Sequence, residues 1–252
     1  MSDGGQGGAK DGTLRALRAR NAWRRLASGL PPSGEIVSPE VPNDLYQAHL
    51  SLYVFAGDLA RGKSVLDVAC GTGYGCARLL ASGAARVVGV ERDPWSLRYA
   101  RRKLGRPGLS FGTGGPSELS DDLGSFDLVV AMGALPRVDD PDRALAGIAR
   151  HLAPGGSLLA SLPPILDGQT LALHQARPRE RSSRYLWDWE EALRERFPSL
   201  RLFRHLPPPG GLPDFADPRP STLRAEDFRF EELPLSEIYD VGSLGAVFVA
   251  GA

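Results

Sequence analysis

Hydrophobic and polar positions follow two different periods along the chain, and each period predicts one kind of element. Short apolar runs predict strands over residues 64–69, 86–90, 109–112, 126–132, 157–162, 200–205 and 245–250. Apolar residues at three- and four-residue spacing predict helices over residues 13–28, 44–61, 75–82, 94–104, 140–153 and 185–197. Strands that alternate with helices are typical of an α/β, doubly wound, mainly parallel sheet, here of seven strands, which binds ligand at the carboxyl ends of its strands.

The pattern also divides the chain into segments. Residues 1–12 are polar and rich in glycine, so we expect them to be a disordered tail. Residues 13–43 form a basic helix and a linker; the helix could bind an acidic partner or simply be a solvated helix that packs loosely on the domain. Residues 44–252 form a single domain, with a core over 62–165 and a substrate-shaping part over 166–252. That last part contains a long excursion rich in proline and acids at 207–240.

Composition and charge exclude some partners and leave others open. The 252 residues include 30 basic and 30 acidic side chains, so there is no charge excess to attract nucleic acid or an anionic membrane. Cys70 and Cys76 match neither a zinc site nor a disulfide framework, and no metal is expected. No apolar run is long enough for a transmembrane helix and no signal peptide is visible, so the expected location is cytoplasmic. A homodimer is left open.

The glycine-rich turn after the first strand, and the acids around it, indicate the ligand. In SVLDVACGTGYG (residues 64–75) the glycines follow Gly-x-Gly-x-Gly, whereas a dinucleotide-binding turn has Gly-x-Gly-x-x-Gly. Asp67 lies within the strand, where an acid suits a cationic amino group better than a pyrophosphate. Glu91 ends the next strand, where a carboxylate can accept hydrogen bonds from both hydroxyls of a ribose. A ribose and an ammonium without a pyrophosphate describe S-adenosylmethionine.

Several segments together resemble one family. VLDVACGTGYG, VVGVERDPWSLRYAR, SFDLVV and IARHLAPGGSLLASLP are similar, in order and spacing, to class I S-adenosylmethionine-dependent methyltransferases of the methyltransferase type 11 group, which includes bacterial small-molecule and glycan methyltransferases. The similarity covers roughly residues 44–165. The segment NDLYQAHLSLYVFA resembles the helix that precedes the first strand in this family. The resemblance implies a Rossmann-like fold with an N-terminal helical lid, and S-adenosyl-L-methionine as the cofactor.

The resemblance also implies roles for individual residues. Asp67, Gly71 and Gly73 would line the methionine portion of the cofactor, with the backbone of Ala69 and Cys70 nearby; Glu91 would hold the ribose, Arg92 would lie near the adenine, and Ala131 and Met132 would border the methyl group. Tyr46 and His49 would cover the cofactor from the preceding helix. Two other interpretations stay open: Asp67 as an acid that only stabilises the turn, and Glu91 as a surface acid.

The sequence departs from the family pattern at two places. The family usually has an aspartate after the third strand that bonds the adenine amino group, and that position is Gly115 here, with Ser117 or backbone groups as substitutes. Many members also carry an acid–histidine pair after the fourth strand, where this chain has Leu135 and Pro136. An imidazole titrates near neutral pH, so its loss leaves the general base unassigned.

These observations favour an enzyme that transfers a methyl group to oxygen or nitrogen of a small-molecule or glycan-like acceptor. The candidate bases, in falling order of preference, are His49, His174, Tyr46, Asp139 and Asp140. The alternative is a catalytically inactive S-adenosylmethionine-binding protein that assembles with another enzyme. A nucleic-acid methyltransferase is disfavoured because a polar-proline-aromatic motif is absent after the fourth strand. Residues 163–183, the helix with Trp187 and Trp189, and the excursion would shape the acceptor pocket. The acids of the excursion either form a rim that favours a neutral or cationic acceptor or belong to a solvated loop.

Overall fold

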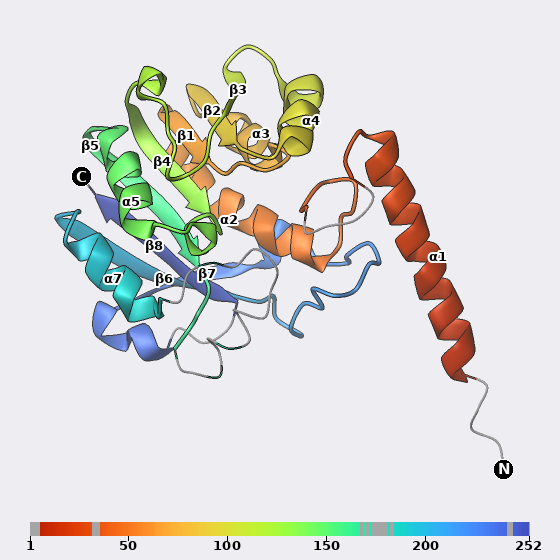
Figure 1. Cartoon of the computed structure of the whole chain (residues 1–252). Helices are drawn as coiled ribbons and strands as arrows, with labels where there is room; N and C mark the ends of the chain where they lie inside the picture. The colour runs from red at the N-terminus through yellow and green to blue at the C-terminus, as the bar shows by residue number, and fades with distance from the viewer. Residues whose placement is uncertain are drawn as a thin grey trace.

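The fold is a single sheet with helices on both faces (Figure 1). The structure is a computed structural model that describes residues 6–31, 36–166, 169, 172, 181, 184–240 and 244–251, with only the backbone for 6–12, 239 and 240. The strands are β1 (Ser64–Val68), β2 (Arg86–Glu91), β3 (Leu109–Thr113), β4 (Phe126–Met132), β5 (Leu152–Leu162), β6 (Ser199–Leu206), β7 (Arg229–Leu233) and β8 (Gly245–Gly251). The helices are α1 (Gln6–Ala27), α2 (Asp44–Ala60), α3 (Tyr74–Ala81), α4 (Pro94–Leu104), α5 (Pro141–Arg150) and α7 (Leu186–Arg194).

The order of the strands places a crevice at the carboxyl ends of β1 and β4. The described strands lie in the order β3-β2-β1-β4-β5-β8-β6-β7, and the first five of these are parallel to one another. Strand β8 runs antiparallel to both of its neighbours, β5 and β6. From β1 the chain adds strands first on one side, through β2 and β3, and then on the other, through β4 and β5. Such a reversal opens the space in which doubly wound sheets bind their ligands.

The predicted mainly parallel, doubly wound sheet is confirmed, but an additional strand extends it. Strand β7 pairs antiparallel with β6 within the excursion that the sequence predicted as loop. Its five residues, RFEEL, are mostly exposed and do not alternate cleanly, because one side of an edge strand faces solvent. Cross-strand ion pairs support it: Arg201 bonds Glu232 at 2.6 Å and Arg204 bonds Glu231 at 2.7 Å.

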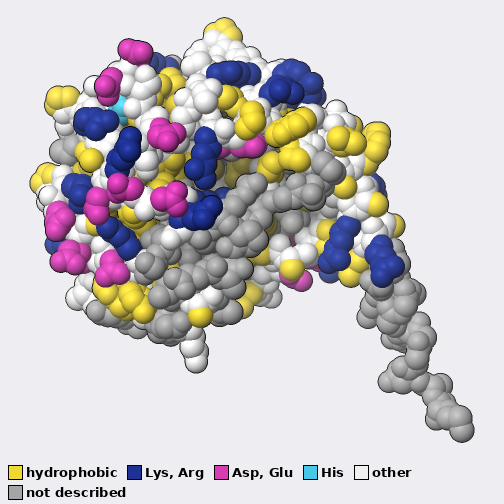
Figure 2. All heavy atoms as spheres, in the orientation of Figure 1, with side chains coloured by type: hydrophobic (Ala, Val, Ile, Leu, Met, Phe, Trp, Pro, Cys, Tyr) yellow, Lys and Arg dark blue, Asp and Glu magenta, His cyan; other side chains and the backbone are white. Residues whose placement is uncertain are grey.

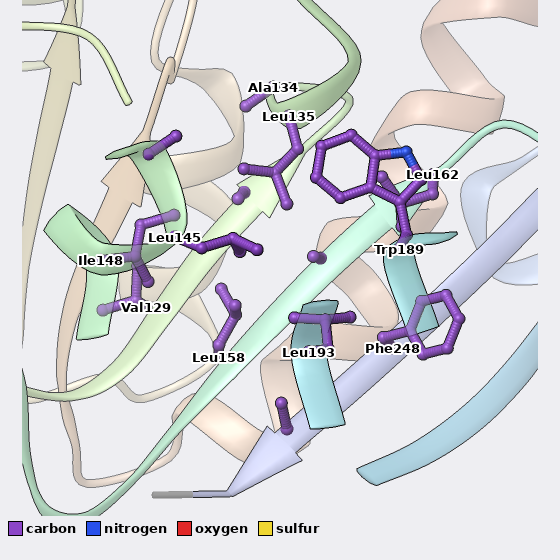
Figure 3. Close-up of a cluster of buried hydrophobic side chains, with 14 of the residues drawn as sticks. Val129, Ala134, Leu135, Leu145, Ile148, Leu158, Leu162, Trp189, Leu193 and Phe248 are labelled. Carbon is purple, nitrogen blue, oxygen red and sulfur yellow. The ribbon is translucent and has the colours of Figure 1, made fainter. Parts of the chain in front are cut away.

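The core lies on both faces of the sheet. On one face, apolar side chains of α5 and α7 point toward β4, β5 and β8, with Trp189, Leu193 and Phe248 almost completely buried (Figure 3). On the other face, Leu52 and Tyr53 of α2 pack with α3 and with the opposite side of β1 and β4. Because the central strands are buried on both faces, they read as continuous apolar runs. This packing fixes the edge of the sheet where the crevice lies.

The excursion between β6 and β8 forms hydrogen bonds with the residues at the start of α2. The amide of Asn43 donates to the carbonyl of Asp217 at 3.1 Å, and the backbone N–H of Ser221 donates to the carbonyl of Pro42 at 2.8 Å. The Ser221 hydroxyl also donates to a carboxylate oxygen of Asp44, at 2.5 Å. The Asn43 side chain caps α2 by accepting from the N–H of Tyr46. Helix α2 is therefore held in place over the sheet by residues far away in the sequence.

Two predicted boundaries are wrong. Helix α1 begins at Gln6 rather than at residue 13, so part of the predicted disordered tail is helical; helix formation is cooperative and extends a nucleated helix. Helix α5 ends at Arg150 and strand β5 begins at Leu152, whereas the sequence predicts a helix to residue 153 and a strand only from residue 157. Leu152 pairs with Phe126 across an irregular register, and residues Pro154, Gly155 and Gly156 lie inside that irregular strand rather than between two elements.

Helix α1 projects away from the sheet (Figure 1). Its carboxyl-terminal end is attached: the Asn21 amide donates to the carbonyl of Pro218 at 2.7 Å, and the Arg102 guanidinium donates to the carbonyl of Ser28 at 2.7 Å. Trp23 is 68% exposed, so the helix buries little apolar surface on the domain.

Candidate functional site

A cavity of about 450 Å³ opens at the carboxyl ends of β1, β2 and β4. This size is in the range of small-molecule sites. Of the residues assigned to the cofactor by resemblance, the following line it: Ala69, Gly71, Glu91, Arg92 and Met132. His49 of α2 also lines it. Asp67, Cys70, Gly73 and Ala131 do not line the cavity.

The three glycines of the turn have three different surroundings. A Cβ on Gly71, whose φ is +56°, would meet nothing within 4 Å. On Gly73 the same atom would lie 2.7 Å from the Phe111 ring, and on Gly75 it would lie 2.1 Å from the Tyr53 ring. Gly71 therefore keeps the cavity open, whereas Gly73 and Gly75 allow β3 and α2 to pack against the turn.

Glu91 is held in a fixed orientation by two backbone amides. One carboxylate oxygen accepts from the N–H of Gly71 at 2.9 Å, and the other accepts from the N–H of Asp93 at 2.8 Å. The side chain is 9% exposed and lines the cavity. A carboxylate oxygen can accept more than one hydrogen bond, so both oxygens keep capacity for hydroxyl donors of a ligand. Glu91 is thus not a surface acid.

Asp67 is completely buried beneath the turn. Its two oxygens accept hydrogen bonds from the Cys76 thiol at 3.1 Å and from the Tyr53 hydroxyl at 3.3 Å. Burial raises the pKa of Asp67 to about 7, although these two hydrogen bonds act in the opposite direction. Tyr53 lines the cavity and Asp67 does not, so any effect of the acid on a ligand passes through that hydroxyl or the field of the carboxylate.

Both cysteines are buried and unpaired. A Cβ on Gly89 of β2 would lie 2.7 Å from the Cys70 sulfur and 2.8 Å from the Cys76 sulfur, so this glycine makes room for both. Burial raises the pKa of the Cys76 thiol well above its ordinary value, and keeps it protonated as a donor to Asp67. These thiols are packing groups and hydrogen-bond donors.

Alternation along β4 separates two other predicted residues. Met132 borders the cavity, whereas the neighbouring Ala131 is completely buried in the core on the other face of the strand. The chain then turns at Gly133, whose φ is +62°.

The region predicted for adenine has a backbone wall. Gly114, Gly115 and Pro116 line the cavity, and the Arg92 side chain passes 3.8 Å from the position of a Cβ on Gly115. The Ser117 hydroxyl instead donates to the carbonyl of Asp140, at 3.4 Å. Backbone groups and Arg92 are therefore placed where the family's aspartate would be, and Ser117 is not.

Among the candidate bases, His49 has the most suitable position. Burial, and then the nearby Arg137 charge, lower the pKa of His49 to about 4, so its ring is neutral at pH 7. Tyr46 does not line the cavity but packs on Tyr74, which does, with ring centres 5.2 Å apart. His174 lies outside the described residues.

The two aspartates have structural partners. Asp140 caps α5 by accepting from the N–H of Arg143 at 2.9 Å. Asp139 forms a long ion pair with Arg181, at 3.9 Å. Neither lines the cavity.

Sequence reasoning missed several residues that line the cavity. Tyr53 follows His49 by one helical turn on α2, a spacing that could have indicated it. Tyr74 directly follows Gly73 in the turn. Ile36 and Val37 belong to the linker before α2, and Arg137 follows β4; no motif marked any of these three.

Four acids of the excursion form ion pairs. Glu226 pairs with Arg78 and Asp217 with Arg219, in addition to the two pairs between β6 and β7. On the face over α5 and α7, acidic and basic side chains are interspersed (Figure 2), partly because Arg184 and Arg196 both bond Asp142. In the described residues, no cluster of side chains could hold a metal ion, and no helix has the length and apolarity required to cross a membrane.

Comparison with known proteins agrees with this geometry. Residues 65–156 match the family described as "Methyltransferase domain". The chain is 31% identical over 140 residues to a protein of Mycolicibacterium smegmatis named "probable S-adenosylmethionine-dependent methyltransferase", covering 55% of this chain and 53% of that protein. It is 32% identical over 136 residues to a tRNA U34 carboxymethyltransferase of Alteromonas mediterranea, covering 50% of this chain and 40% of that protein. The chain spans about half the length of the curated relatives it matches.

A solved structure extends the likeness of the fold to most of the chain. It is the complex of the Haloferax volcanii Trm112 methyltransferase activator with a methyltransferase, which matches with a TM-score of 0.60 at 20% identity over 95% of this chain and 96% of that chain. The fold is that of an α/β protein with a cavity at the switch point of its parallel strands, where such sheets bind ligands. The residues that match the methyltransferase domain, 65–156, include the glycine turn, Glu91 and Met132 of the cavity.

Proposed function

We propose that this chain transfers a methyl group from S-adenosylmethionine to oxygen or nitrogen of a small-molecule acceptor. The observation that carries the proposal is the pairing of Glu91 with Gly71: a carboxylate oriented by a backbone amide, beside a glycine that leaves the cavity open. S-adenosylmethionine needs both features, because its ribose hydroxyls require a hydrogen-bond acceptor and its methionine portion requires open space beside the turn.

The residues present fit the cofactor. Glu91 would accept hydrogen bonds from the two ribose hydroxyls, and the open side of Gly71 would accept the chain of the methionine portion. The Tyr53 hydroxyl, which is hydrogen-bonded to Asp67, would transmit the electrostatic effect of this acid to the amino group. The Gly114–Gly115 backbone would border the adenine. When bound, the cofactor supplies a methyl group that is already activated by a sulfonium.

The chain's own contribution to transfer is alignment and exclusion of water. Met132 and Gly133 at the end of β4 border the cavity next to His49. An acceptor bound there would be held next to the methyl group of the cofactor. Holding two reactants in line in this way supplies several orders of magnitude in rate. A base adds about 10²–10⁴-fold where the acceptor loses a proton, and we assign this role to His49.

Two measurements test the proposal. Isothermal titration of the full chain with S-adenosylmethionine and with S-adenosylhomocysteine should give saturable binding, and no binding at about millimolar ligand would contradict it. A screen of small-molecule acceptors, read as release of S-adenosylhomocysteine, should then give turnover. The relative from Alteromonas mediterranea is named for a tRNA, so RNA belongs in the screen; turnover on RNA alone would overturn the acceptor class.

The second candidate is a protein that binds the cofactor without transferring methyl. The observation that favours it is the backbone wall at Gly115, where an acid would usually hold the adenine. Binding in the titration together with no turnover on any acceptor would support this candidate over the first.

A further inference from the structure

A second cavity, of about 160 Å³, lies next to the first on the side of α2. His49, Gly133 and Arg137 line both cavities, so they form the boundary between them. The rest of its wall comes from α2, from the end of β5 and from the beginning of β8, with Phe215 of the excursion. An acceptor bound here would meet a methyl group at this boundary, beside His49.

The wall of the second cavity is mainly apolar and carries one charge. The apolar side chains that line it are those of Leu45, Ala48, Leu52, Pro136, Leu162, Pro163, Phe215, Leu244 and Ala246. Of the described residues that line it, Arg137 is the only one with a formal charge at neutral pH, and none is a carboxylate. A cationic amine would find no counter-charge here and would be repelled by Arg137. Of the neutral and cationic acceptors that an acidic rim would favour, this lining suits only the neutral one.

The two histidines of this wall are neutral. Burial, and then charge repulsion from His49, lower the pKa of His205 to about 4. The Ser51 hydroxyl donates to the carbonyl of Ala48 at 2.7 Å and therefore accepts at 2.9 Å from Nε2 of His205, which fixes the tautomer with the proton on Nε2. Phe230 of β7 stacks on the His205 ring with centres 4.8 Å apart and planes inclined by 3°.

The size of the second cavity suits an acceptor of one ring. A protein cavity of about 150 Å³ lined by apolar side chains holds a benzene molecule. The second cavity is of this size, so one ring would fill it and a two-ring body would extend beyond it. Leu45 is half-buried and lines this cavity alone, so its truncation would enlarge the second cavity without opening the first.

The residues at the boundary between the two cavities restrict how weakly acidic the acceptor hydroxyl can be. His49 is a weak base with a pKa of about 4. A phenol ionises at about 10, whereas an aliphatic hydroxyl resembles water at roughly 16. The weak base can therefore assist only an acidic hydroxyl, and the Arg137 charge at the same boundary would stabilise the developing phenolate.

We propose that the second cavity binds a neutral, single-ring phenol and that the chain methylates its oxygen, with His49 accepting the proton. This inference rests on the proposed methyltransferase function and names its acceptor class. The phenol oxygen forms the new bond to the methyl carbon as the carbon–sulfur bond breaks and its electron pair goes to sulfur. The hydroxyl proton passes to the His49 imidazole and then to water.

The test is ligand-observed saturation-transfer NMR on the full chain, with S-adenosylhomocysteine present and three probes: phenol, benzylamine and 2-naphthol. Phenol should bind at least about tenfold more tightly than benzylamine, which is cationic at neutral pH, and more tightly than 2-naphthol. Equal binding of phenol and benzylamine would overturn the proposal. Activity is a separate readout: the product should be anisole, with stoichiometric release of S-adenosylhomocysteine.

Two variants with opposite effects connect the binding to this cavity. Ala48→Leu fills it and should weaken phenol binding about tenfold or more, while calorimetry gives an unchanged affinity for S-adenosylhomocysteine. Leu45→Ala enlarges the cavity and should shift the preference toward 2-naphthol, which keeps the test decisive if Ala48→Leu does not fold. An unchanged probe preference in Leu45→Ala, or full phenol binding by a folded Ala48→Leu variant, would place the acceptor elsewhere. If S-adenosylhomocysteine itself does not bind, the proposed function fails; if it binds and phenol is not preferred, only this inference fails.

Discussion

The hydroxyl of Tyr53 lies 3.3 Å from a carboxylate oxygen of Asp67, so the helix that covers the site is bonded directly to the acid inside the first strand. The contact depends on Gly75, because any side chain at that position would overlap the Tyr53 ring. Tyr53 also lines the cavity. One tyrosine thus joins α2, the glycine turn and the buried acid.

The buried acid should make stability depend on pH. The pKa of Asp67 is about 7 in the folded chain against an ordinary value of 3.8, so between these values the folded state holds a proton that the unfolded state has lost. Its contribution therefore falls as pH rises from about 4 to about 7, by up to roughly 4 kcal/mol. Asp67→Asn removes this dependence, so relative to the parent it should gain stability from about pH 5 to about pH 8. Urea unfolding of both proteins across this range measures it; parallel curves would contradict the buried, protonated acid.

The histidines act in the opposite direction on the acid side. His49 and His205 have a pKa of about 4 in the folded chain against 6.5 ordinarily, so their contribution is complete above about pH 6.5 and is lost as pH falls toward about 4. This dependence is common to the parent and Asp67→Asn, which is why the difference between the two proteins isolates the acid.

Comparing Gly71→Ala with Gly62→Ala should distinguish the loss of stability caused by backbone strain from a loss of ligand affinity. Gly71 and Gly62 both have positive φ, +56° and +73°, and a Cβ on either meets nothing within 4 Å; only Gly71 borders the cavity. Both alanine variants should lose about 1–2 kcal/mol of stability. Only Gly71→Ala should weaken S-adenosylhomocysteine binding, by about tenfold or more, as measured by calorimetry. Equal affinities in the two variants would show that the turn does not contact the ligand.

Glu91→Gln should weaken cofactor binding by about 10–100-fold, because hydrogen bonds to a charged group contribute about 1.5–3 kcal/mol. The amide nitrogen of glutamine would also face a backbone N–H, of either Gly71 or Asp93, which it cannot accept from. The matched control is Glu231→Gln, an exposed acid on β7. Calorimetry at constant ionic strength is the measurement, and an unchanged affinity in Glu91→Gln would remove the ribose assignment.

His49→Gln should reduce the rate of transfer by about 10²-fold or more if the imidazole takes the acceptor proton. With a pKa of about 4, the base stays unprotonated through the neutral range, so the parent rate should not decline on acidification until below about pH 5. Tyr46→Phe is the matched control, since its hydroxyl does not line the cavity. An apparent pKa near 6.5 in the parent, or a larger loss in Tyr46→Phe than in His49→Gln, would argue against His49 as the base.

Local patterns were sufficient for the elements of the parallel half. Strands β1, β2 and β4 are largely buried on both faces, so their sequences are mainly apolar. The Asp93 cap with Pro94 at the start of α4 is a purely local signal. Strand β7 could not be predicted in the same way. Its residues are stabilised by charges on β6, which the sequence places far away.

For the site, the sequence by itself determined the glycine turn and the acid that ends β2, and hence the class of cofactor that we propose, because these depend on residues adjacent along the chain or one βα unit apart. Only the tertiary structure decided that Gly71 faces the cavity while Gly73 and Gly75 face Phe111 and Tyr53. It also decided that His49 and His205 share one wall. Those relations arise from packing between α2, β6 and the turn, and side chains that meet only through packing leave no local pattern to read.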